Sequence, residues 1–363
     1  MKNYTKPILL AVALVLVAWG LPPLEDANAQ DDRIFNSRFG LVDAYENAPV
    51  AFQSGAGWEA FELRWDLLQP SSASEWNAEA IPEERFSNAR NANREMVGIL
   101  VGTPAWATGG PAGSGVPSGL FQPPSDSSNV WASFVRQAVN YYTARGVNRW
   151  VIWNEPDTAT WSGSIEEYYQ LVKTAYIVAK EANPNALIHL GGITSRDPGW
   201  FNQLAIVAAG DPTAAPNDFY FDVASLHVYY DAERIHDLTA NTYFAMSQQG
   251  IPLKPVWVNE MNARPAVDPL AYPGPTDFNS NPNITMALQA SFVVQAYALG
   301  FSAGADRLAV YRLVDDFTLD DQEAFGLVRE DVRPGPPTPP IRLPRANWQA
   351  GDLRAASMSK LTH

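Results

Sequence analysis

The chain has 363 residues, of which 46% are hydrophobic and 18% are charged, a balance typical of a folded globular protein rather than a disordered one. Acidic residues outnumber basic ones by 39 to 25, giving a formal net charge of −14, and nucleic acids and anionic membrane surfaces repel so acidic a chain. Neutral ligands stay open: the 12 Trp, 14 Tyr and 16 Phe supply rings that suit the apolar faces of sugars, although most must serve the core.

The first 29 residues have the pattern of a secretory signal peptide. Lys2 and Lys6 precede an apolar run over residues 8–21, and the small-residue pattern Ala-Asn-Ala ends at Ala29. A membrane anchor is the alternative, but the run is short for a span of about 20 residues. We expect cleavage after Ala29 and a secreted or periplasmic protein that is not membrane-bound. The sequence contains no cysteine, so its core must stabilise it without disulfides.

Eight apolar runs along the chain are predicted to be strands. Most are nearly continuous in apolar residues, as strands covered on both faces should be. The runs lie at 39–45, 60–65, 96–102, 149–155, 187–192, 221–229, 255–260 and 307–313.

Helical patterns lie between these strands. The segment after Ser128 carries an apolar stripe, and Ser164 with Glu167 forms a capping box ahead of a second stripe. A third helix is predicted at about 284–299 and closes at Gly300. The Asn-Ile-Thr sequon at 283–285 is therefore interpreted as the start of this helix rather than as a glycosylation site.

Strands that alternate with helices imply a parallel sheet, and eight of them without an obvious edge imply a closed (β/α)8 barrel, here a single domain over 30–333. An open doubly wound sheet is the rival, but no glycine-rich phosphate loop follows the first strand. The tail at 334–363 departs from the pattern, because five prolines between Pro334 and Pro340 exclude a helix where the last barrel helix is expected. We expect that helix to be atypical or missing; a linker-like tail and a truncated or out-of-frame C-terminus are alternative hypotheses.

Two glutamates stand at matching positions in this pattern. Glu155 ends the fourth run and Glu260 ends the seventh, and each follows an asparagine. Catalytic groups of a (β/α)8 barrel lie at the C-terminal ends of its strands. Hydrolysis of a glycosidic bond requires two such carboxylates, one to give a proton to the leaving oxygen and one to stay ionised. Either glutamate alone could be a polar strand end, but the matching pair indicates a function.

The motifs Trp-Asn-Glu-Pro-Asp at 153–157 and Trp-Val-Asn-Glu-Met at 257–261 resemble those of the clan A (β/α)8 glycoside hydrolases. The nearest likenesses are glycoside hydrolase family 39 and the cellulase-type family 5, and the resemblance covers the strand ends over roughly residues 38–331. It implies a retaining double displacement with Glu155 as general acid/base and Glu260 as nucleophile. It also implies that Asn154 hydrogen-bonds the sugar 2-hydroxyl.

The same resemblance implies further substrate-binding groups. Arg64, near the end of the second strand, would keep Glu260 ionised; the alternative is a surface ion pair with Asp66. His227 and Tyr229 resemble a pair at the end of the sixth strand, and strand alternation puts both side chains on one side. Tyr229 would donate to the nucleophile, whereas a lone histidine is otherwise most often a satisfied core group.

Two tryptophans are candidates for sugar-stacking platforms. Trp106 follows the third strand and Trp161 follows the fourth, and tryptophans in loops have less reason to belong to the core. Trp153 and Trp257 are strand residues and are expected to pack instead.

We therefore expect a secreted retaining glycosidase that acts on a neutral, β-linked oligo- or polysaccharide, with no cofactor and no metal; transglycosylation would use the same residues. A metal-dependent hydrolase is one alternative, but the chain has only 4 His and no pair at ligand spacing. A catalytically inactive carbohydrate-binding barrel is the other. The unusual C-terminus keeps it open, because an unclosed barrel could misplace Glu260 by the roughly 1 Å that matters for catalysis.

Overall fold

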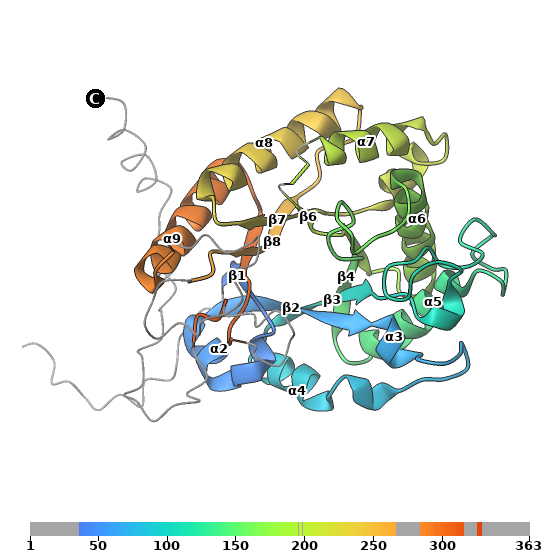
Figure 1. The fold of residues 1–363 in the computed structure, drawn as a ribbon, viewed down its shortest axis with the longest axis horizontal. Coiled ribbons are helices and arrows are strands. Elements are labelled where there is room, and N and C mark those ends of the chain that lie inside the picture. Colours follow the sequence, from blue (N-terminus) through green and yellow to red (C-terminus); the bar gives the residue numbers. More distant parts are fainter. Residues whose placement is uncertain (1–35, 195, 198, 266–283, 316–324, 329–363) are drawn as a thin grey trace, which may run out of the picture. The chain divides into compact units, whose positions relative to one another are not determined.

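The computed structural model describes residues 36–194, 196–197, 199–265, 284–315 and 325–328. The predicted signal peptide and the proline-rich tail lie outside the described residues, together with most of the loop that follows Glu260. Figure 1 shows the described part as strands at the centre with helices around them. In this part of the chain none of the helices has the length and apolarity that crossing a bilayer requires.

The described strands form one parallel sheet. They are β1 (Asn36–Val42), β2 (Ala56–Arg64), β3 (Glu95–Val101), β4 (Val147–Ile152), β5 (Leu187–Leu190), β6 (Ile193–Thr194), β7 (Ala224–Tyr229), β8 (Val256–Asn262) and β9 (Arg307–Val310). Their order is β5-β4-β3-β2-β1-β9-β8-β7-β6. Every neighbouring pair is parallel, as strands joined by crossover helices must be.

The sheet closes into a barrel because β5 and β6 share one strand position. β5 pairs with β4 and β6 pairs with β7, and only Gly191 and Gly192 separate the two strands. His189 of β5 also bridges to Val223, one residue before β7. All eight predicted strands are confirmed, and the open doubly wound alternative is wrong.

The glycine pair between β5 and β6 is needed for close packing. A Cβ atom on Gly192 would lie 1.8 Å from Nε2 of His227, and one on Gly191 would lie 2.9 Å from the carbonyl oxygen of Ile152. No side chain fits at either position, so both residues between β5 and β6 must be glycine for the chain to pack against His227 and Ile152.

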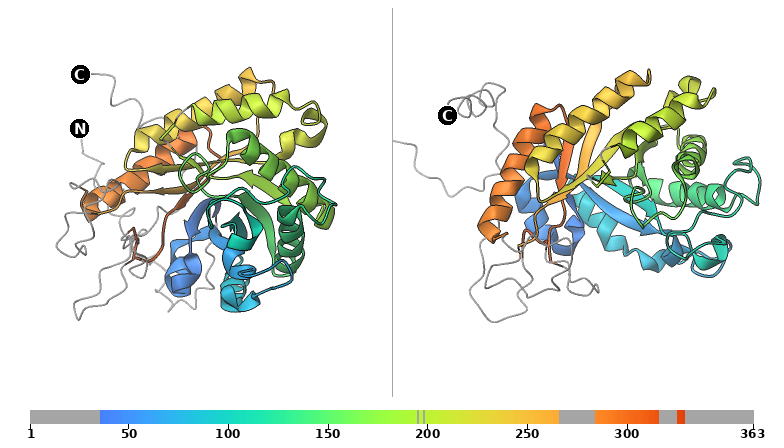
Figure 2. Two further views of the ribbon diagram at one scale, coloured as in Figure 1. Left: turned by 45° about the vertical axis from the view of Figure 1, so that its right-hand side comes forward. Right: turned by 45° about the horizontal axis from the view of Figure 1, so that its top comes forward.

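Helices cover the outside of the sheet, as the two views of Figure 2 show. They are α2 (Ala48–Ser54), α3 (Trp65–Leu68), α4 (Glu83–Asn91), α5 (Val130–Thr143), α6 (Ile165–Ala182), α7 (Trp200–Gly210), α8 (Ala232–Gln248) and α9 (Met286–Ser302). The side chain of Asn129 caps α5 by accepting a hydrogen bond from Ala132 N. The predicted capping box of Ser164 and Glu167 begins α6. The first two predicted helices are thus confirmed.

The third predicted helix, α9, begins and ends slightly later than the sequence predicts. Thr285 caps it by accepting a hydrogen bond from Leu288 N. Gly300 lies inside the helix rather than at its end. The position is glycine because a Cβ atom there would lie 2.7 Å from the side chain of Leu308. Gly300 therefore allows α9 to pack on β9 and does not terminate it.

The floor of the barrel is an aromatic and ionic cluster built from the first residues of the strands. The rings of Trp58 and Trp257 lie 4.8 Å apart, and because β2 and β8 are not neighbours this contact crosses the barrel interior. The guanidinium carbons of Arg149 and Arg307 lie 4.7 and 4.4 Å from the centre of the Trp257 ring, and both side chains donate to Glu95. The expectation that Trp257 serves packing is confirmed.

Residues 325–328 return to the end of β9. The amide of Val328 donates to Leu313 O at 3.0 Å, and that of Leu327 donates to Arg312 O at 3.2 Å. The described residues that follow β9, 311–315 and 325–328, contain no helix. The predicted absence of a regular last helix concerns residues outside the described ranges and stays a prediction.

Candidate active site

Glu155 lies just beyond β4, in a turn that ends the strand three residues earlier than the sequence predicts. The backbone is left-handed at Trp153 and at Glu155, with φ of 73° and 48°, a conformation that costs a non-glycine residue about 1 kcal/mol or more. Thr160 stabilises the turn, since its hydroxyl contacts the carbonyl oxygens of Asn154 and Glu155 at 2.6 and 2.8 Å. The turn places Glu155 at the C-terminal end of the barrel.

Glu260 faces the barrel interior because β8 contains a bulge. Leu226 of β7 pairs with Val258, but the next residue of β7, His227, pairs with Glu260 rather than with Asn259. The register with β9 shifts in the same stretch. Because strand side chains alternate between faces, one extra residue turns Glu260 to the same side as Trp257.

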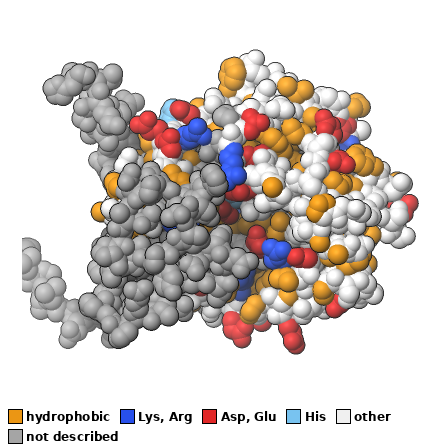
Figure 3. All heavy atoms as spheres, viewed as in Figure 1, with side chains coloured by type: hydrophobic (Ala, Val, Ile, Leu, Met, Phe, Trp, Pro, Cys, Tyr) orange, Lys and Arg blue, Asp and Glu red, His pale blue; other side chains and the backbone are white. Residues whose placement is uncertain are grey.

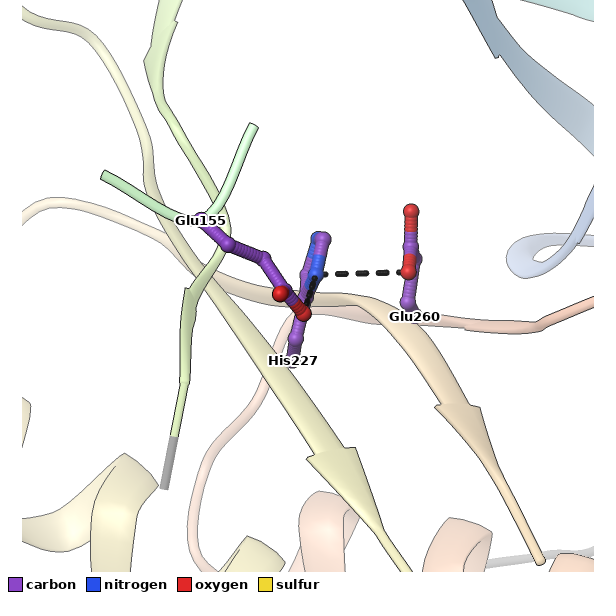
Figure 4. A group of neighbouring side chains, drawn as sticks. All are labelled: Glu155, His227 and Glu260. Atoms are coloured by element: carbon purple, nitrogen blue, oxygen red, sulfur yellow. Dashed lines mark hydrogen bonds and ion pairs between the residues drawn. The ribbon is translucent and has the colours of Figure 1, made fainter. Parts of the chain in front are cut away.

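His227 lies between the two glutamates, and Figure 4 shows all three side chains converging. Its Nδ1 atom is 3.1 Å from Oε1 of Glu155 and 3.3 Å from Oε2 of Glu260, and the residue is 1% exposed. Burial alone would lower the pKa of His227, but the carboxylates of Glu260 and Glu155 outweigh it and raise the pKa above its usual value. His227 is therefore not an isolated core histidine: it hydrogen-bonds Glu155 and lies within ion-pair distance of Glu260.

Tyr229 fixes the orientation of Glu260 from the same strand as His227. Its hydroxyl donates to Oε2 of Glu260 at 2.6 Å. Burial, followed by the nearby Glu260 carboxylate, raises the pKa of Tyr229 well above its usual value, so the phenol keeps the proton that it donates to Glu260. The structure thus brings together four predicted residues, Glu155, His227, Tyr229 and Glu260.

The spacing of the two carboxylates has a chemical meaning. One oxygen of Glu155, one oxygen of Glu260 and one ring nitrogen of His227 all lie within 4.8 Å of one another. Retaining glycosidases hold their two carboxyl groups about 5–5.5 Å apart, whereas inverting ones need about 6.5–9.5 Å to admit a water molecule. An oxygen–oxygen distance of at most 4.8 Å is closer to the spacing of retaining enzymes.

Asn154, next to Glu155, offers an unused acceptor. Its Oδ1 atom is buried and has no hydrogen-bond partner among the described residues. A buried carbonyl without a donor costs free energy unless a ligand satisfies it. This fits the predicted contact with a sugar hydroxyl, which stays a prediction.

Arg64 makes the ion pair that the sequence left as an alternative. Its Nη2 and Nε atoms donate to the Asp66 carboxylate at 2.7 and 3.1 Å, and Nη1 lies 3.6 Å from Glu62. Asp66 in turn approaches Gly102, where a Cβ atom would lie 2.7 Å from Oδ1. Arg64 therefore stands at the end of β2 between two acids, and its predicted action on Glu260 stays a prediction.

Trp161 is almost fully buried, which does not favour the predicted stacking role; that role stays a prediction. It is 5% exposed and packs edge-on against Trp153 and Tyr168. Its indole N–H donates to Ser164 O at 3.1 Å. Gly163 makes this possible, because a Cβ atom there would lie 2.7 Å from the Trp161 ring. The loop folds back onto the start of α6, so Trp161 packs there.

Trp106 is half-buried and keeps part of its surface open. Its indole N–H donates to Gln69 O at 2.6 Å, and the ring meets Trp65 edge-on at 5.9 Å. The hydrogen bond fixes the ring plane, as a stacking platform requires, but the predicted role in sugar binding is not tested by these contacts.

Two supports of the site were not predicted. The carboxylate of Asp157 accepts hydrogen bonds from the amide and hydroxyl of Thr194 and ties the Glu155 turn to β6. Asp157 belongs to the motif at 153–157, so a signal was present in the sequence.

Phe325 packs against Tyr229 with ring centres 5.4 Å apart, and its carbonyl oxygen accepts from Asn262 at 2.7 Å. No local pattern indicates that contact.

The three converging side chains also qualify as metal ligands. Glu155, His227 and Glu260 form a group of described residues whose donor atoms are close enough to share an ion. Sequence spacing gave no sign of it, because the three residues belong to different strand ends.

No protein-family model matches the sequence, and no curated protein matches it either. Solved structures do match. A family 39 glycoside hydrolase from the gut symbiont Bacteroides cellulosilyticus WH2 has a TM-score of 0.61 and 15% identity over 82% of this chain and 61% of its own. A monomeric β-xylosidase from Caulobacter crescentus CB15 has a TM-score of 0.57 and 14% identity over 82% of this chain and 65% of its own.

A third similar structure comes from another family. The catalytic domain of family 30 xylanase C from Talaromyces cellulolyticus has a TM-score of 0.54 and 12% identity over 84% of this chain and 73% of its own. The chain thus spans less than two thirds of the length of the first two structures. Identities this low establish the fold and not the reaction. By its fold the chain resembles the (β/α)8 barrels of the clan A glycoside hydrolases, family 39 among them.

Proposed function

We propose that the chain is a retaining glycoside hydrolase that cleaves O-glycosidic bonds of a neutral, β-linked oligo- or polysaccharide. The observation that carries this proposal is the pair of carboxylates at the C-terminal end of the barrel, Glu155 after β4 and Glu260 in β8. One oxygen of each lies within 4.8 Å of the other. The likeness in fold to families 39 and 30 supports the same reaction class.

In the first step an oxygen of Glu260 forms a bond to the anomeric carbon while the bond from that carbon to the leaving oxygen breaks. Glu155 gives its proton to the leaving oxygen, so the departing group leaves as an alcohol. Tyr229 and His227 both approach Oε2 of Glu260 and so fix the orientation of the attacking carboxylate. The hydrogen bond from Tyr229 and the nearby imidazole of His227 stabilise the ionised form that attack requires.

In the second step Glu155, now ionised, takes a proton from water, and the water oxygen displaces Glu260 from the anomeric carbon. The Glu155 side chain is 23% exposed, so water can reach it, whereas that of Glu260 is 9% exposed. This difference supports the assignment of roles, because only the acid/base must exchange protons with solvent. The unused Oδ1 of Asn154 would accept a hydrogen bond from the sugar.

The names of the similar structures support a choice of first substrates. Two of those structures are named a β-xylosidase and a xylanase, so aryl β-xylosides are the first substrates to test, followed by β-glucosides and β-mannosides.

We propose that the protein acts outside the cytoplasm after removal of residues 1–29; N-terminal sequencing of the exported protein would test this.

The roles of the two glutamates can be separated by azide rescue. Replacing Glu260 by Gly should abolish hydrolysis, and azide should then yield the α-glycosyl azide, because it attacks where the nucleophile stood. Replacing Glu155 by Ala should allow azide to yield the β-glycosyl azide from a substrate with an activated leaving group. Glu181→Gln, an exposed glutamate on α6, is the matched control and should keep full activity.

The outcomes distinguish the proposal from its rivals. A folded wild-type protein that turns over none of the sugars would favour the inactive carbohydrate-binding barrel. Undiminished turnover in the Glu260→Gly variant would remove Glu260 from the mechanism. An α-configured first product from wild-type protein would contradict retention.

A further inference from the structure

We propose that Glu155, His227 and Glu260 also form a binding site for a divalent ion of the zinc and copper class, and that an ion bound there blocks the substrate. The binding does not depend on the proposed function, but the inhibition does. The site would be inhibitory: the ion occupies the space between the two carboxylates, where the anomeric carbon and the leaving oxygen must lie.

The distances among the three side chains suit such an ion. Zinc binds imidazole nitrogen and carboxylate oxygen at about 2.0–2.2 Å in a tetrahedral arrangement, so two of its ligands lie about 3.3 Å apart. The His227 nitrogen is 3.1 Å from the Glu155 oxygen and 3.3 Å from the Glu260 oxygen. Two of the three distances between ligand atoms thus already have the required length.

The third distance, between the oxygens of Glu155 and Glu260, can shorten because the Glu155 side chain is partly exposed. The two carboxylate oxygens lie within 4.8 Å of each other and must approach to about 3.3 Å. Glu155 has its side chain 23% exposed, whereas Glu260 is held by Tyr229. Glu155 therefore makes the movement, and the attraction of both carboxylates to the cation replaces their mutual repulsion.

The donor set selects the kind of ion. One imidazole nitrogen and two carboxylate oxygens suit zinc and copper, while magnesium and calcium prefer six or more oxygen ligands. The three protein ligands leave a fourth position toward solvent, as in catalytic zinc sites.

The surroundings of His227 limit the affinity. A ligating histidine normally donates its other ring nitrogen to a carboxylate or carbonyl, and losing such a partner costs about 10–100-fold in affinity. Nε2 of His227 is buried against Gly192 without a hydrogen-bond partner among the described residues. The ion should therefore bind reversibly and be removed by a chelator, unlike a resident cofactor.

Titration calorimetry of the chelator-treated, full-length protein with zinc chloride tests the proposal. One zinc ion should bind per chain, and His227→Ala should weaken this binding at least about tenfold. The matched control is His236→Ala, because His236 is an exposed histidine beside Asp237 and is the natural rival site. Magnesium chloride at the same concentration should give no binding. Cobalt(II), with its visible absorption, reports the ligand set directly.

A second variant keeps the test decisive. If His227→Ala fails to fold, as judged by thermal unfolding, Glu155→Gln replaces it, since an amide is a poor zinc ligand. Zinc binding that survives His227→Ala and disappears in His236→Ala would overturn the proposal, as would no binding to the wild type at millimolar zinc.

The inhibition is measured separately on an aryl glycoside. Zinc should raise KM and leave kcat unchanged, and excess chelator should restore the original KM. A glycosidase that neither binds zinc nor responds to it would sink this inference and leave the proposed function intact. A protein that binds zinc through His227 but hydrolyses no glycoside would contradict the proposed function and leave the zinc site standing.

Discussion

The hydroxyl of Tyr229 donates a hydrogen bond to Oε2 of Glu260 at 2.6 Å, although the residue opposite Tyr229 in the sheet is Asn262. The phenol ring thus reaches back along β8 toward the carboxylate, and Phe325 packs against it. This contact is the most direct support of the proposed nucleophile.

Removing that hydroxyl should slow catalysis. A hydrogen bond to a charged group is worth about 2 kcal/mol, so Tyr229→Phe should lower kcat on an aryl glycoside about 30-fold. The matched control is Tyr297→Phe, because the buried Tyr297 hydroxyl has no hydrogen-bond partner among the described residues. Equal losses in both variants would mean that the effect is structural.

A methyl group at Gly192 should displace His227 from the two carboxylates. The added carbon would lie 1.8 Å from Nε2 of His227, so the ring must move, and a shift of about 1 Å near reacting groups can cost about 100-fold in rate. Gly192→Ala should therefore lower kcat/KM by about that factor. Gly210→Ala is the control, since a Cβ atom there meets nothing within 4 Å. A fully active Gly192→Ala protein would show that the position of His227 does not matter.

The barrel and the two glutamates could be predicted because their signals are local. A buried parallel strand is a short continuous apolar run, and the polar residue that ends it marks the barrel mouth. Glu155 lies three residues beyond the end of β4 and Glu260 lies two residues before the end of β8, so both are near the predicted strand ends.

The remaining features depend on contacts between distant segments. The bulge that turns Glu260 inward is defined only by the register with β7 and β9. The break at Gly191 and Gly192 has meaning only once His227 lies against it. Phe325 reaches Tyr229 across nearly a hundred residues of sequence, a contact that no periodicity encodes.

Trp161 should act on stability rather than on substrate binding. Loop position suggested a platform, but the ring is 5% exposed and packed. Trp161→Ala should therefore lower the free energy of unfolding by about 3–5 kcal/mol and leave KM for an aryl glycoside within about twofold. Urea unfolding and steady-state kinetics on the same preparation check both parts. A large rise in KM with unchanged stability would restore the platform role.

The buried pair of Glu59 and Arg94 should make stability depend on pH. Both side chains are fully buried, and Arg94 Nε lies 3.0 Å from Glu59 Oε2. Burial raises the pKa of Glu59 to about 7, with Arg94 and then Arg85 opposing the rise. A carboxyl group whose pKa is higher in the folded than in the unfolded chain stabilises the fold below the unfolded value of about 4.5. This contribution is lost as pH rises through about 7.

The loss amounts to about 3 kcal/mol between pH 4.5 and pH 8. Replacing Glu59 by Gln removes the titration, so the difference in free energy of unfolding between wild type and Glu59→Gln should change by about that amount over the same range. Urea unfolding at pH 4.5 and pH 8 measures it. The control is Glu181→Gln, an exposed glutamate whose removal should leave the pH dependence of wild type unchanged. A difference that stays constant with pH would mean that Arg94 keeps Glu59 ionised, because the attraction between the two charges then exceeds the cost of burying them.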